Sequence, residues 1–264
     1  MGAGRLGQAI IRGLIRAGIN SANIAASVKT LKSAENVRKL GIKVFLDNEK
    51  VIRDSDLVII ALKPHTIINV LHSLATSFEE KIVVSVAALI PLKTYSHALN
   101  NAEIYRAMPN INVEINKGFT ALCGNKGYNA ELVEKIFSLL GEVVWVDEDV
   151  LDKLTLISAS TPALVAELID AMELAALYLG VPHDLARKAV INVFAGTAEL
   201  TSIKDLLNIR NAVITPKGIT IKLLRKYLSL NIKSSIMDMF IYASNELDKA
   251  LKRFSEYSTT KSSD

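Results

Sequence analysis

The chain begins Met1-Gly2-Ala3-Gly4-Arg5-Leu6-Gly7, and apolar residues at helical spacing follow immediately. The glycines at 2, 4 and 7 match the pattern G-x-G-x-x-G. In that pattern the first glycine permits a tight turn, the second lets the backbone approach a pyrophosphate, and the third lets a helix pack closely on a strand. The helix N-terminus supplies N–H groups to the anion. Because a helix follows at once and a strand candidate comes about 20 residues later, the stretch predicts a dinucleotide-binding loop.

A strand should precede this loop, and it would lie before residue 1. Such a strand normally occupies the centre of the sheet, so its loss would expose apolar faces and unpaired backbone groups. Two interpretations remain open. Either the natural start lies upstream of Met1, or the domain works without its first strand. We favour the shortened start, which predicts impaired cofactor binding.

The rest of the first half alternates short β-rich runs with amphipathic stretches. The run Leu57–Leu62 is apolar throughout, as expected for a parallel strand buried on both faces. Alternation of this kind predicts βαβ units and a mainly parallel sheet. Residues 1–148 are therefore predicted to form an α/β Rossmann-type domain that lacks its first strand. Further strands are expected at Ile24–Ser27, Lys43–Leu46, Ile82–Val86, Glu103–Ala107, Phe119–Cys123 and Val143–Val146.

The pattern changes after residue 148, where no convincing strand is found. One long helix is expected over Leu151–Leu179, with a break near Pro162, and a loop is expected over Asn208–Gly218. The segment Leu164–Tyr178 is apolar on more than one face, which is typical of a buried helix. Residues 149–264 are therefore predicted to form an all-α domain. We interpret its apolar surface as a homodimer interface, with a self-contained monomeric bundle as the alternative.

The cofactor is suggested by the residues after the first strand candidate. Domains that use NAD place Asp or Glu about 20 residues past the glycines, where the carboxylate holds the ribose 2′-hydroxyl. Here the stretch reads Ala26-Ser27-Val28-Lys29-Thr30 and contains no acid. Its hydroxyls and its cation suit a 2′-phosphate, so NADP(H) is predicted, with NAD(H) as the alternative. Lys29 could also be merely a solvated loop residue.

Composition excludes several other classes. Lys and Arg total 31 and Asp and Glu total 27, a net charge of +4. Basic residues do not cluster, so no nucleic-acid partner is expected. The single cysteine, Cys123, is predicted to lie in the core; it permits no internal disulfide or thiolate zinc site and suits a reducing cytoplasm. One cysteine and four scattered histidines also give no reason to expect a metal site. No apolar run approaches the roughly 18 residues of a membrane helix, so no membrane partner is expected.

Six motifs follow one another along essentially the whole chain. They are the Gly-Ala-Gly loop, Asp47-Asn48 before a helix, the run Asp56 to Lys63-Pro64, Tyr105-Arg106-Ala107-Met108-Pro109-Asn110, Leu179-Gly180-Val181-Pro182 with Leu185-Ala186, and Thr215-Pro216-Lys217-Gly218-Ile219-Thr220. Their order resembles the pyrroline-5-carboxylate reductase family. The segment Arg106–Asn110 resembles that family's R-x-M-P-N signature. It is either a ligand-binding segment or a stiff loop between domains.

The resemblance implies NADPH-dependent reduction of 1-pyrroline-5-carboxylate to L-proline, the last step of proline biosynthesis. It places the cofactor at the glycine loop and the cyclic imino acid in the helical domain, between subunits of a homodimer or larger assembly. The implied catalytic residue is Thr220, which contacts the imine nitrogen. The candidate cofactor-binding residues are Gly2, Gly4, Arg5, Leu6, Gly7, Ser27, Lys29, Asn48, Ala61, Lys63 and Pro64. The candidate substrate-binding residues are Thr215, Lys217, Gly218, Ile219 and Thr220.

This chemistry needs little from the protein beyond orientation and a dry site, because an imine can arrive already protonated. Thr220 begins a predicted helix, whose first N–H groups could hold the substrate carboxylate. The absence of an evident His–Asp pair agrees with this reading and disfavours a 2-hydroxy-acid dehydrogenase.

Two departures from the family pattern put the substrate in question. Where the family has SGSGPAY, this chain has Ser158-Ala159-Ser160-Thr161-Pro162-Ala163-Leu164, so both glycines and the tyrosine are replaced. In the second loop Lys217 replaces a glycine and Ile219 a small residue. Lys217 either adds a cation for a carboxylate or points to solvent. Two alternatives therefore stay open: a reductase of a related cyclic imino acid such as a six-membered ring, and a catalytically weak nucleotide-binding relative.

Overall fold

The structure is a computed structural model that describes residues 1–125 and 127–261, and it divides into two compact units. The first unit contains Met1–Pro162 together with the chain from Ser244 onward. The second unit is Ala163–Ala243. The domain boundary drawn from the sequence at residues 148 and 149 stays a prediction.

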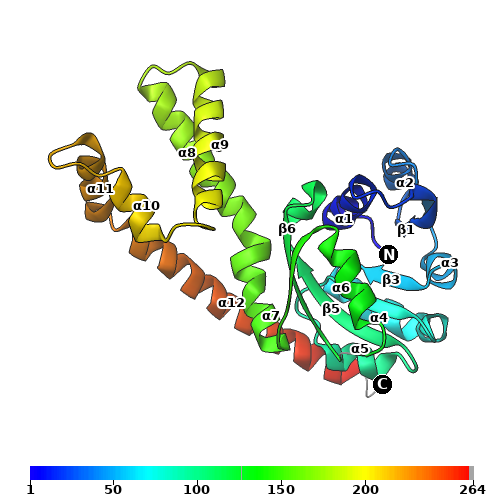
Figure 1. The fold of residues 1–264 in the computed structure, drawn as a ribbon. Helices are drawn as coiled ribbons and strands as arrows, with labels where there is room; N and C mark the ends of the chain where they lie inside the picture. Colours follow the sequence, from blue (N-terminus) through cyan, green and yellow to red (C-terminus); the bar gives the residue numbers. More distant parts are fainter. Residues whose placement is uncertain (126, 262–264) are drawn as a thin grey trace. The chain divides into compact units, whose positions relative to one another are not determined.

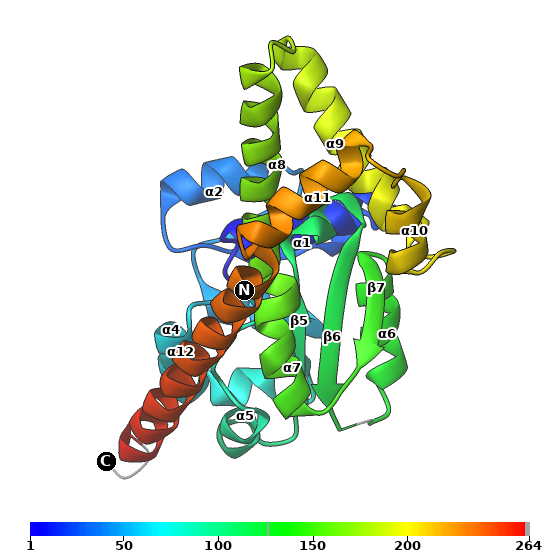
Figure 2. The same cartoon turned by 90° about the vertical axis from the view of Figure 1, so that its left-hand side faces the viewer.

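The first unit is built on a five-stranded sheet in the order β3-β4-β5-β6-β7. Neighbouring strands are parallel except for β5 and β6, which are antiparallel (Figure 2). The expected mainly parallel sheet is confirmed, with β6 as the exception. A short 3-10 turn, η3 (Ile111–Ile115), joins β5 to β6 where a parallel pair would need a long crossover. The strands are β3 (Leu57–Ile60), β4 (Ile82–Ser85), β5 (Glu103–Pro109), β6 (Gly118–Gly124) and β7 (Gly141–Trp145).

A separate two-stranded parallel sheet is formed by β1 (Ala25–Ser27) and β2 (Lys43–Phe45). In the described chain no strand joins β1 to β3. Met1 lies between them: its amino group donates to the Ile59 carbonyl over 2.7 Å and its carbonyl accepts from the Ala61 N–H over 2.9 Å (Figure 1). The strand that the sequence predicts before residue 1 thus has no counterpart between β1 and β3 in the residues that the structure describes.

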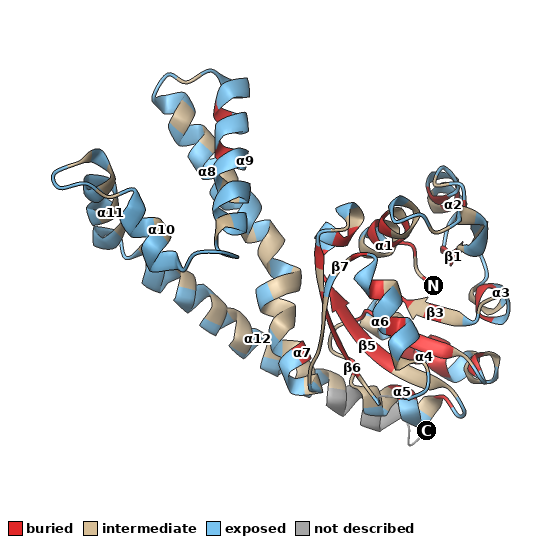
Figure 3. Ribbon diagram, viewed as in Figure 1, coloured by how far each residue is buried: buried red, intermediate tan, exposed pale blue. Residues whose placement is uncertain are grey.

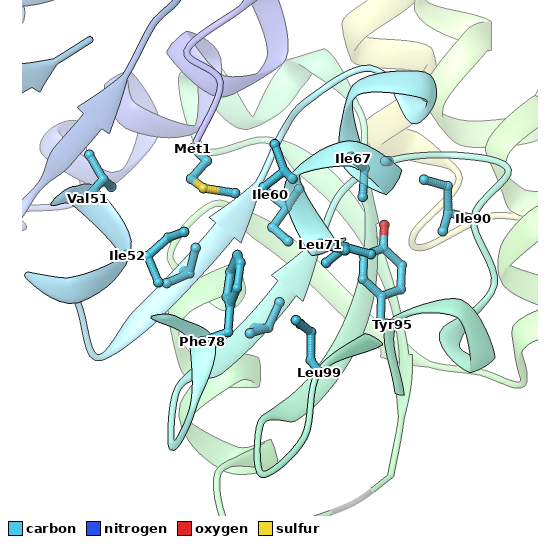
Figure 4. Packing of buried hydrophobic residues seen from close by; sticks show 14 residues of the cluster. Met1, Val51, Ile52, Ile60, Ile67, Leu71, Phe78, Ile90, Tyr95 and Leu99 are labelled. Carbon is cyan, nitrogen blue, oxygen red and sulfur yellow. The ribbon is translucent and has the colours of Figure 1, made fainter. Parts of the chain in front are cut away.

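Helices cover both faces of the larger sheet. On one face α1 (Arg5–Arg16) and α6 (Ala130–Ser138) contribute buried Ile10 and Phe137 to a cluster with Val84 and Leu122. On the other face α3 (Asn48–Arg53), α4 (Pro64–Ser73) and α5 (Leu92–Ala98) pack around a second cluster (Figure 4). Buried residues accordingly concentrate on the strands and on the helix faces beside them (Figure 3). The labelled members of the second cluster are Met1, Val51, Ile52, Ile60, Ile67, Leu71, Phe78, Ile90, Tyr95 and Leu99.

The long helix predicted from Leu151 is interrupted before Pro162, as expected. It consists of α7 (Glu148–Leu154), a π-helical segment η4 (Thr155–Ser160) and α8 (Thr161–Tyr178). A proline ring clashes with the carbonyl four residues earlier in a regular helix, and the wider π turn relieves that clash. The hydroxyls of Ser160 and Thr161 donate to carbonyls five residues before them, over 3.2 and 3.1 Å.

The second unit is helical throughout its regular structure. It holds most of α8, then α9 (His183–Leu200), α10 (Leu206–Ala212), α11 (Ile219–Ser229) and the start of α12 (Ile232–Lys261). The prediction of a loop from Asn208 was wrong, because α10 occupies its first residues. The side chain of Asp205 caps this helix by accepting from the Asn208 N–H over 3.0 Å, a signal that the apolar pattern does not contain.

One described helical stretch, Glu148–Tyr178, is long and apolar enough by length and composition to cross a membrane, with a mean hydropathy of 1.3 in its best window. The sequence expectation took Ile82–Leu92 as the longest apolar run and therefore passed over this helix. A single helix of this kind is weak evidence for a membrane span, because packed helices pass the same test. Several of its large apolar side chains are exposed in the chain by itself: Val165, Leu168, Met172, Leu174 and Leu177.

Candidate functional site

Each of the three positions of the loop holds glycine for a different structural reason. Gly2 has a φ of +79°, and a Cβ there would lie 2.7 Å from the Ala61 carbonyl oxygen. A Cβ on Gly7 would lie 2.6 Å from the Gly2 oxygen. Gly4 has nothing within 4 Å of its Cβ position and is exposed. The fold itself therefore requires glycine at 2 and 7, whereas at 4 the chain leaves open space beside its backbone.

That open space adjoins the N-terminus of α1. Gly4 is the N-cap of this helix and no side chain caps it. The N–H groups of Arg5, Leu6 and Gly7 lie in the first turn, where a helix offers no acceptor of its own. Unpaired donors and the positive end of the helix dipole favour an anion. The residues present thus fit the pyrophosphate of a dinucleotide.

Ser27 and Asn48 meet beside the glycine loop. The Ser27 hydroxyl donates to Asn48 Oδ1 over 2.6 Å, and the Ser27 carbonyl accepts from the N–H groups of Gly2 and Ala3, each over 3.2 Å. Ser27 is 1% exposed. Its hydroxyl is therefore committed inside the fold, and Lys29 is the exposed cation of this segment.

The remaining cofactor candidates lie after β3. The backbone of Ala61 contacts the glycine loop, as the Gly2 and Gly7 geometry shows. Lys63 is the N-cap of α4 and Pro64 occupies its first turn. The Lys63 side chain is exposed. The loop glycines, Ser27, Asn48 and Ala61 are thus brought together by contacts, whereas Lys29 and Lys63 are placed at the surface.

Sequence reasoning missed the ion-pair network around Arg106. This residue lies within β5, so the segment from Arg106 begins as a buried strand and not as a loop between domains. Its Nη1 donates to Glu148 Oε1 and its Nη2 to Asp152 Oδ1, each over 2.7 Å. The same Glu148 oxygen accepts from the Leu92 N–H over 2.7 Å. Arg106 therefore ties α7 to the sheet, and Glu148 in turn accepts from the first residue of α5.

At Arg106 the ion pairs change the pKa more than burial does. Desolvation by itself lowers its pKa, but the bonds to Asp152 and Glu148 raise the pKa above its ordinary value. The side chain is 1% exposed, and its Nε has no hydrogen-bond partner in the described residues. The acids at 148 and 152 lie one helical turn apart on α7. That spacing is the only sequence signal for this network, and it does not name the partner.

Asn110 connects the end of β5 to the π-helical segment. Its Nδ2 donates to Ser158 Oγ over 3.3 Å, while its Oδ1 accepts from the Asn112 N–H over 3.2 Å. Ser158 belongs to the segment that departs from the family pattern. Ala159, one of the two residues that replace glycine there, packs against the cluster containing Met108 and Cys123.

Cys123 is buried, as predicted, and burial raises the pKa of its thiol to about 11. The thiol is thus protonated at neutral pH, which argues against a nucleophilic role. No group of three or more His, Cys, Asp or Glu side chains is arranged to hold a metal ion in the described residues.

The candidate substrate loop lies in the second unit, between α10 and α11. Gly218 is the N-cap of α11, which has no side-chain cap, and Ile219 and Thr220 are its first two residues. Lys217, which replaces a family glycine, is exposed and has a φ of +60°. The backbone thus keeps a left-handed conformation that suits glycine even though the residue has changed.

We expect Lys217→Gly to stabilise the second unit. A non-glycine residue in the left-handed region costs about 1 kcal/mol, so the free energy of unfolding should rise by up to about that amount. Urea denaturation measures the change. Lys217→Gln is the matched control, because it removes the charge and keeps a non-glycine side chain in the same left-handed conformation. A lower stability of the glycine variant would contradict the expectation.

Two family models match different parts of the chain. Residues 1–89 match the family model described as NADP oxidoreductase coenzyme F420-dependent, and residues 148–249 match that of pyrroline-5-carboxylate reductase dimerisation. A dinucleotide-binding oxidoreductase fold joined to a helical dimerisation region is the class that these matches define. The chain is 33% identical over 258 residues to the pyrroline-5-carboxylate reductase of Methanosarcina acetivorans, covering 92% of this chain and 94% of that protein.

Other relatives agree. The pyrroline-5-carboxylate reductase 3 of Mus musculus is 33% identical over 229 residues, 84% of each chain. A pyrroline-5-carboxylate reductase structure from Coxiella burnetii is 28% identical, with a TM-score of 0.79 and coverage of 97% and 96%. The Plasmodium falciparum enzyme, solved with NADP bound, has the same fold with a TM-score of 0.83 at 23% identity, covering 96% of this chain and 95% of that one. The chain belongs to the pyrroline-5-carboxylate reductase family, which confirms the resemblance and the fold class.

Proposed function

We propose that the protein reduces 1-pyrroline-5-carboxylate to L-proline with NADPH, the last step of proline biosynthesis. One observation carries the cofactor part of this proposal. Gly4 leaves open space at the uncapped N-terminus of α1, beside the paired Ser27 and Asn48. The cyclic imine as substrate is supported by family membership and by the relatives of that name.

In this proposal the first unit holds the cofactor. The N–H groups of Arg5, Leu6 and Gly7 bind the pyrophosphate, and Lys29 pairs with a 2′-phosphate, which makes NADPH the preferred form and NADH the alternative. Asn48, held by Ser27, and the segment Ala61, Lys63 and Pro64 line the site. When bound, NADPH supplies a hydride to the carbon of the C=N bond.

The loop of the second unit holds the substrate. N–H groups at the uncapped start of α11 bind the carboxylate, with Thr215, Lys217, Gly218 and Ile219 around it. The Thr220 hydroxyl hydrogen-bonds the imine nitrogen and orients it. The imine arrives protonated from solution, so the chain needs no strong acid, and its contribution is orientation and exclusion of water.

The test is NADPH consumption at 340 nm with 1-pyrroline-5-carboxylate, run in parallel with NADH. We expect turnover with both and a higher kcat/KM with NADPH. NADPH binding without turnover would contradict the catalytic proposal and would favour a nucleotide-binding relative without activity.

The departures of two segments from the family pattern support an alternative substrate. Lys217 and Ile219 in one loop, with Ala159 and Thr161 in the other segment, replace small residues of the family pattern. The reaction is then the same hydride transfer to a related cyclic imino acid. Comparing kcat/KM on five- and six-membered rings distinguishes the two, and a preference for the larger ring would replace the proline assignment.

Assembly and location belong to the same proposal. The exposed apolar side chains of α8 and the match to a dimerisation model support a homodimer or larger homo-oligomer. The single free thiol agrees with a cytoplasmic location. Sedimentation of the purified chain tests the assembly, and a monomer at micromolar concentration would contradict it.

We expect Thr220→Val to lower kcat about tenfold with little change in KM, because one hydrogen bond to the reacting nitrogen is worth about 1 to 1.5 kcal/mol. Steady-state kinetics measure it. Thr220→Ser keeps the hydroxyl and should retain most of the activity. An unchanged kcat in the valine variant would remove Thr220 from the catalytic role.

A further inference from the structure

Tyr95 of α5 brings a polar group into the apolar cluster that Figure 4 shows. Its side chain is 0% exposed, and its hydroxyl lies 2.5 Å from Oγ of Ser85, the last residue of β4, which is also 0% exposed. Burial raises the pKa of Tyr95 to about 12, so the hydroxyl keeps its proton at neutral pH. A phenylalanine would fill the same space with no polar group to satisfy, so packing by itself does not require tyrosine.

Ser85 in turn supports residues 86–90, here called the β4 loop. Its Oγ accepts from the Ala87 N–H over 3.3 Å. At the far end of the loop the Leu92 N–H donates to Glu148 Oε1 over 2.7 Å. The β4 loop is therefore held at its start by the paired hydroxyls and just past its end by the ion-pair network of Arg106.

The backbone of the β4 loop is strained near its centre. Leu89 has a φ of +71°, a left-handed conformation that costs a non-glycine residue about 1 to 2 kcal/mol. Such conformations persist where the surrounding structure imposes them, and they concentrate at functional sites. Ala88 and Ala159 both pack against the cluster that contains Met108. The loop is thus a supported surface beside the segment that departs from the family pattern.

The β4 loop begins next to the residues proposed to bind the cofactor. Ser85 pairs with Ile60, and the Val86 N–H donates to the Ile60 carbonyl over 3.0 Å. The loop therefore starts one strand spacing, about 4.8 Å, from Ala61, whose backbone contacts the glycine loop. Ligands of such folds bind outside the carboxyl ends of the parallel strands. With the pyrophosphate at α1 and the 2′-phosphate at Lys29 after β1, the other half of the dinucleotide extends past β3 toward the β4 loop.

We propose that Tyr95 is a positioning residue for hydride transfer. Through Ser85 its hydroxyl fixes the β4 loop, and the loop supports the nicotinamide ring at the distance from the imine carbon that the transfer needs. Because Tyr95 is fully buried, it acts only through the loop. The transfer itself is that of the proposed function, on which this inference rests, and Tyr95 adds no bond-making step to it.

Tyr95→Phe tests the proposal, because it removes the hydroxyl and keeps the ring in the cluster. We expect kcat for imine reduction to fall about tenfold, since a shift of about 1 Å at the reacting atoms costs up to about a hundredfold. The Kd for NADPH should change by less than about twofold, because the pyrophosphate contacts at α1 are untouched. In the ligand-free chain the Ala87 amide should exchange at least about ten times faster, because its acceptor is no longer held.

Two further variants separate positioning from a loss of stability. Ser85→Ala breaks the same link from the other side, and the double variant with Tyr95→Phe should be no slower than the slower single variant. Tyr105→Phe is the matched control, because Tyr105 is also 0% exposed and its hydroxyl donates to Glu103 at the start of β5, away from the carboxyl ends of the strands. It should lower the free energy of unfolding and leave kcat unchanged.

A kcat for Tyr95→Phe within about twofold of the parent chain would overturn the proposal. An equal loss of kcat in Tyr105→Phe would also overturn it, because the effect would then follow stability and not the loop. If Tyr95→Phe does not fold, Ser85→Ala is compared with Tyr105→Phe by the same measurements.

A chain that binds NADPH without reducing the imine would contradict the proposed function, and a second readout then decides the role of Tyr95. The fluorescence lifetime of bound NADPH reports how firmly the nicotinamide ring is held. A shorter lifetime in Tyr95→Phe than in the parent chain and in Tyr105→Phe supports the positioning role. Equal lifetimes in all three chains overturn it, and a chain that binds no NADPH contradicts both proposals.

Discussion

Replacing Gly4 with alanine is expected to weaken NADPH binding about a hundredfold. The backbone at this position must approach the pyrophosphate. A Cβ in the open space would hold the anion away from the N–H groups of α1, and the loss of a hydrogen bond to a charged group, about 1.5 to 3 kcal/mol, corresponds to roughly that factor. The folded chain should tolerate the change, because nothing lies within 4 Å of the added Cβ. The free energy of unfolding should fall by no more than about 1 kcal/mol, since alanine is a poorer N-cap than glycine.

NADPH fluorescence titration measures the affinity and urea denaturation measures the stability. Gly196→Ala is the matched control: its Cβ also meets nothing within 4 Å, but it lies in α9, away from the loop. That change should leave the affinity intact. Gly7→Ala is the opposite control, since its Cβ would lie 2.6 Å from the Gly2 oxygen and should destabilise the fold itself. An unaltered NADPH affinity in the Gly4 variant would show that the open space is not the cofactor site.

Replacing Arg106 with alanine is expected to lower the free energy of unfolding by about 3 kcal/mol. Removing one partner of a buried ion pair leaves the other charge without compensation. Here two carboxylates lose their partner, Glu148 at 31% and Asp152 at 17% exposure, so water screens each in part. We therefore expect the lower end of the range for buried pairs. The attachment of α7 to β5 should weaken most.

Denaturant unfolding gives the total change, and amide exchange of α7 shows where it occurs. The triple variant Arg106→Met, Glu148→Gln and Asp152→Asn removes all three charges at similar volume, and it should recover much of the loss. A cost below about 1 kcal/mol for Arg106→Ala would mean that the network contributes no more than a surface ion pair.

Local signals in the sequence predicted most of the elements correctly. The apolar run from Leu57 forms β3, and Pro162 marks the break in the long helix because its ring disturbs the turn before it. Two short helices were missed. The start of α10 depends on the side-chain cap of Asp205, which the apolar pattern does not contain, and α5 was not predicted at all.

The candidate site divides in the same way. The glycine loop was recognised because its three glycines have fixed spacing within seven residues. The partners of Arg106 lie 42 and 46 residues away, so no spacing rule identifies them. The hydroxyl of Ser27 donates to Asn48, 21 residues further on, and no spacing rule identifies that partner either.

By itself the sequence determined the family, the class of fold and the glycine loop, because each depends on short motifs or on the period of apolar residues. Only the tertiary structure decided that β6 runs antiparallel and that Arg106 is a buried tie between α7 and the sheet. The physical reason is that strand direction and ion-pair partners depend on which distant segments pack together, and a linear pattern of residues does not contain that information.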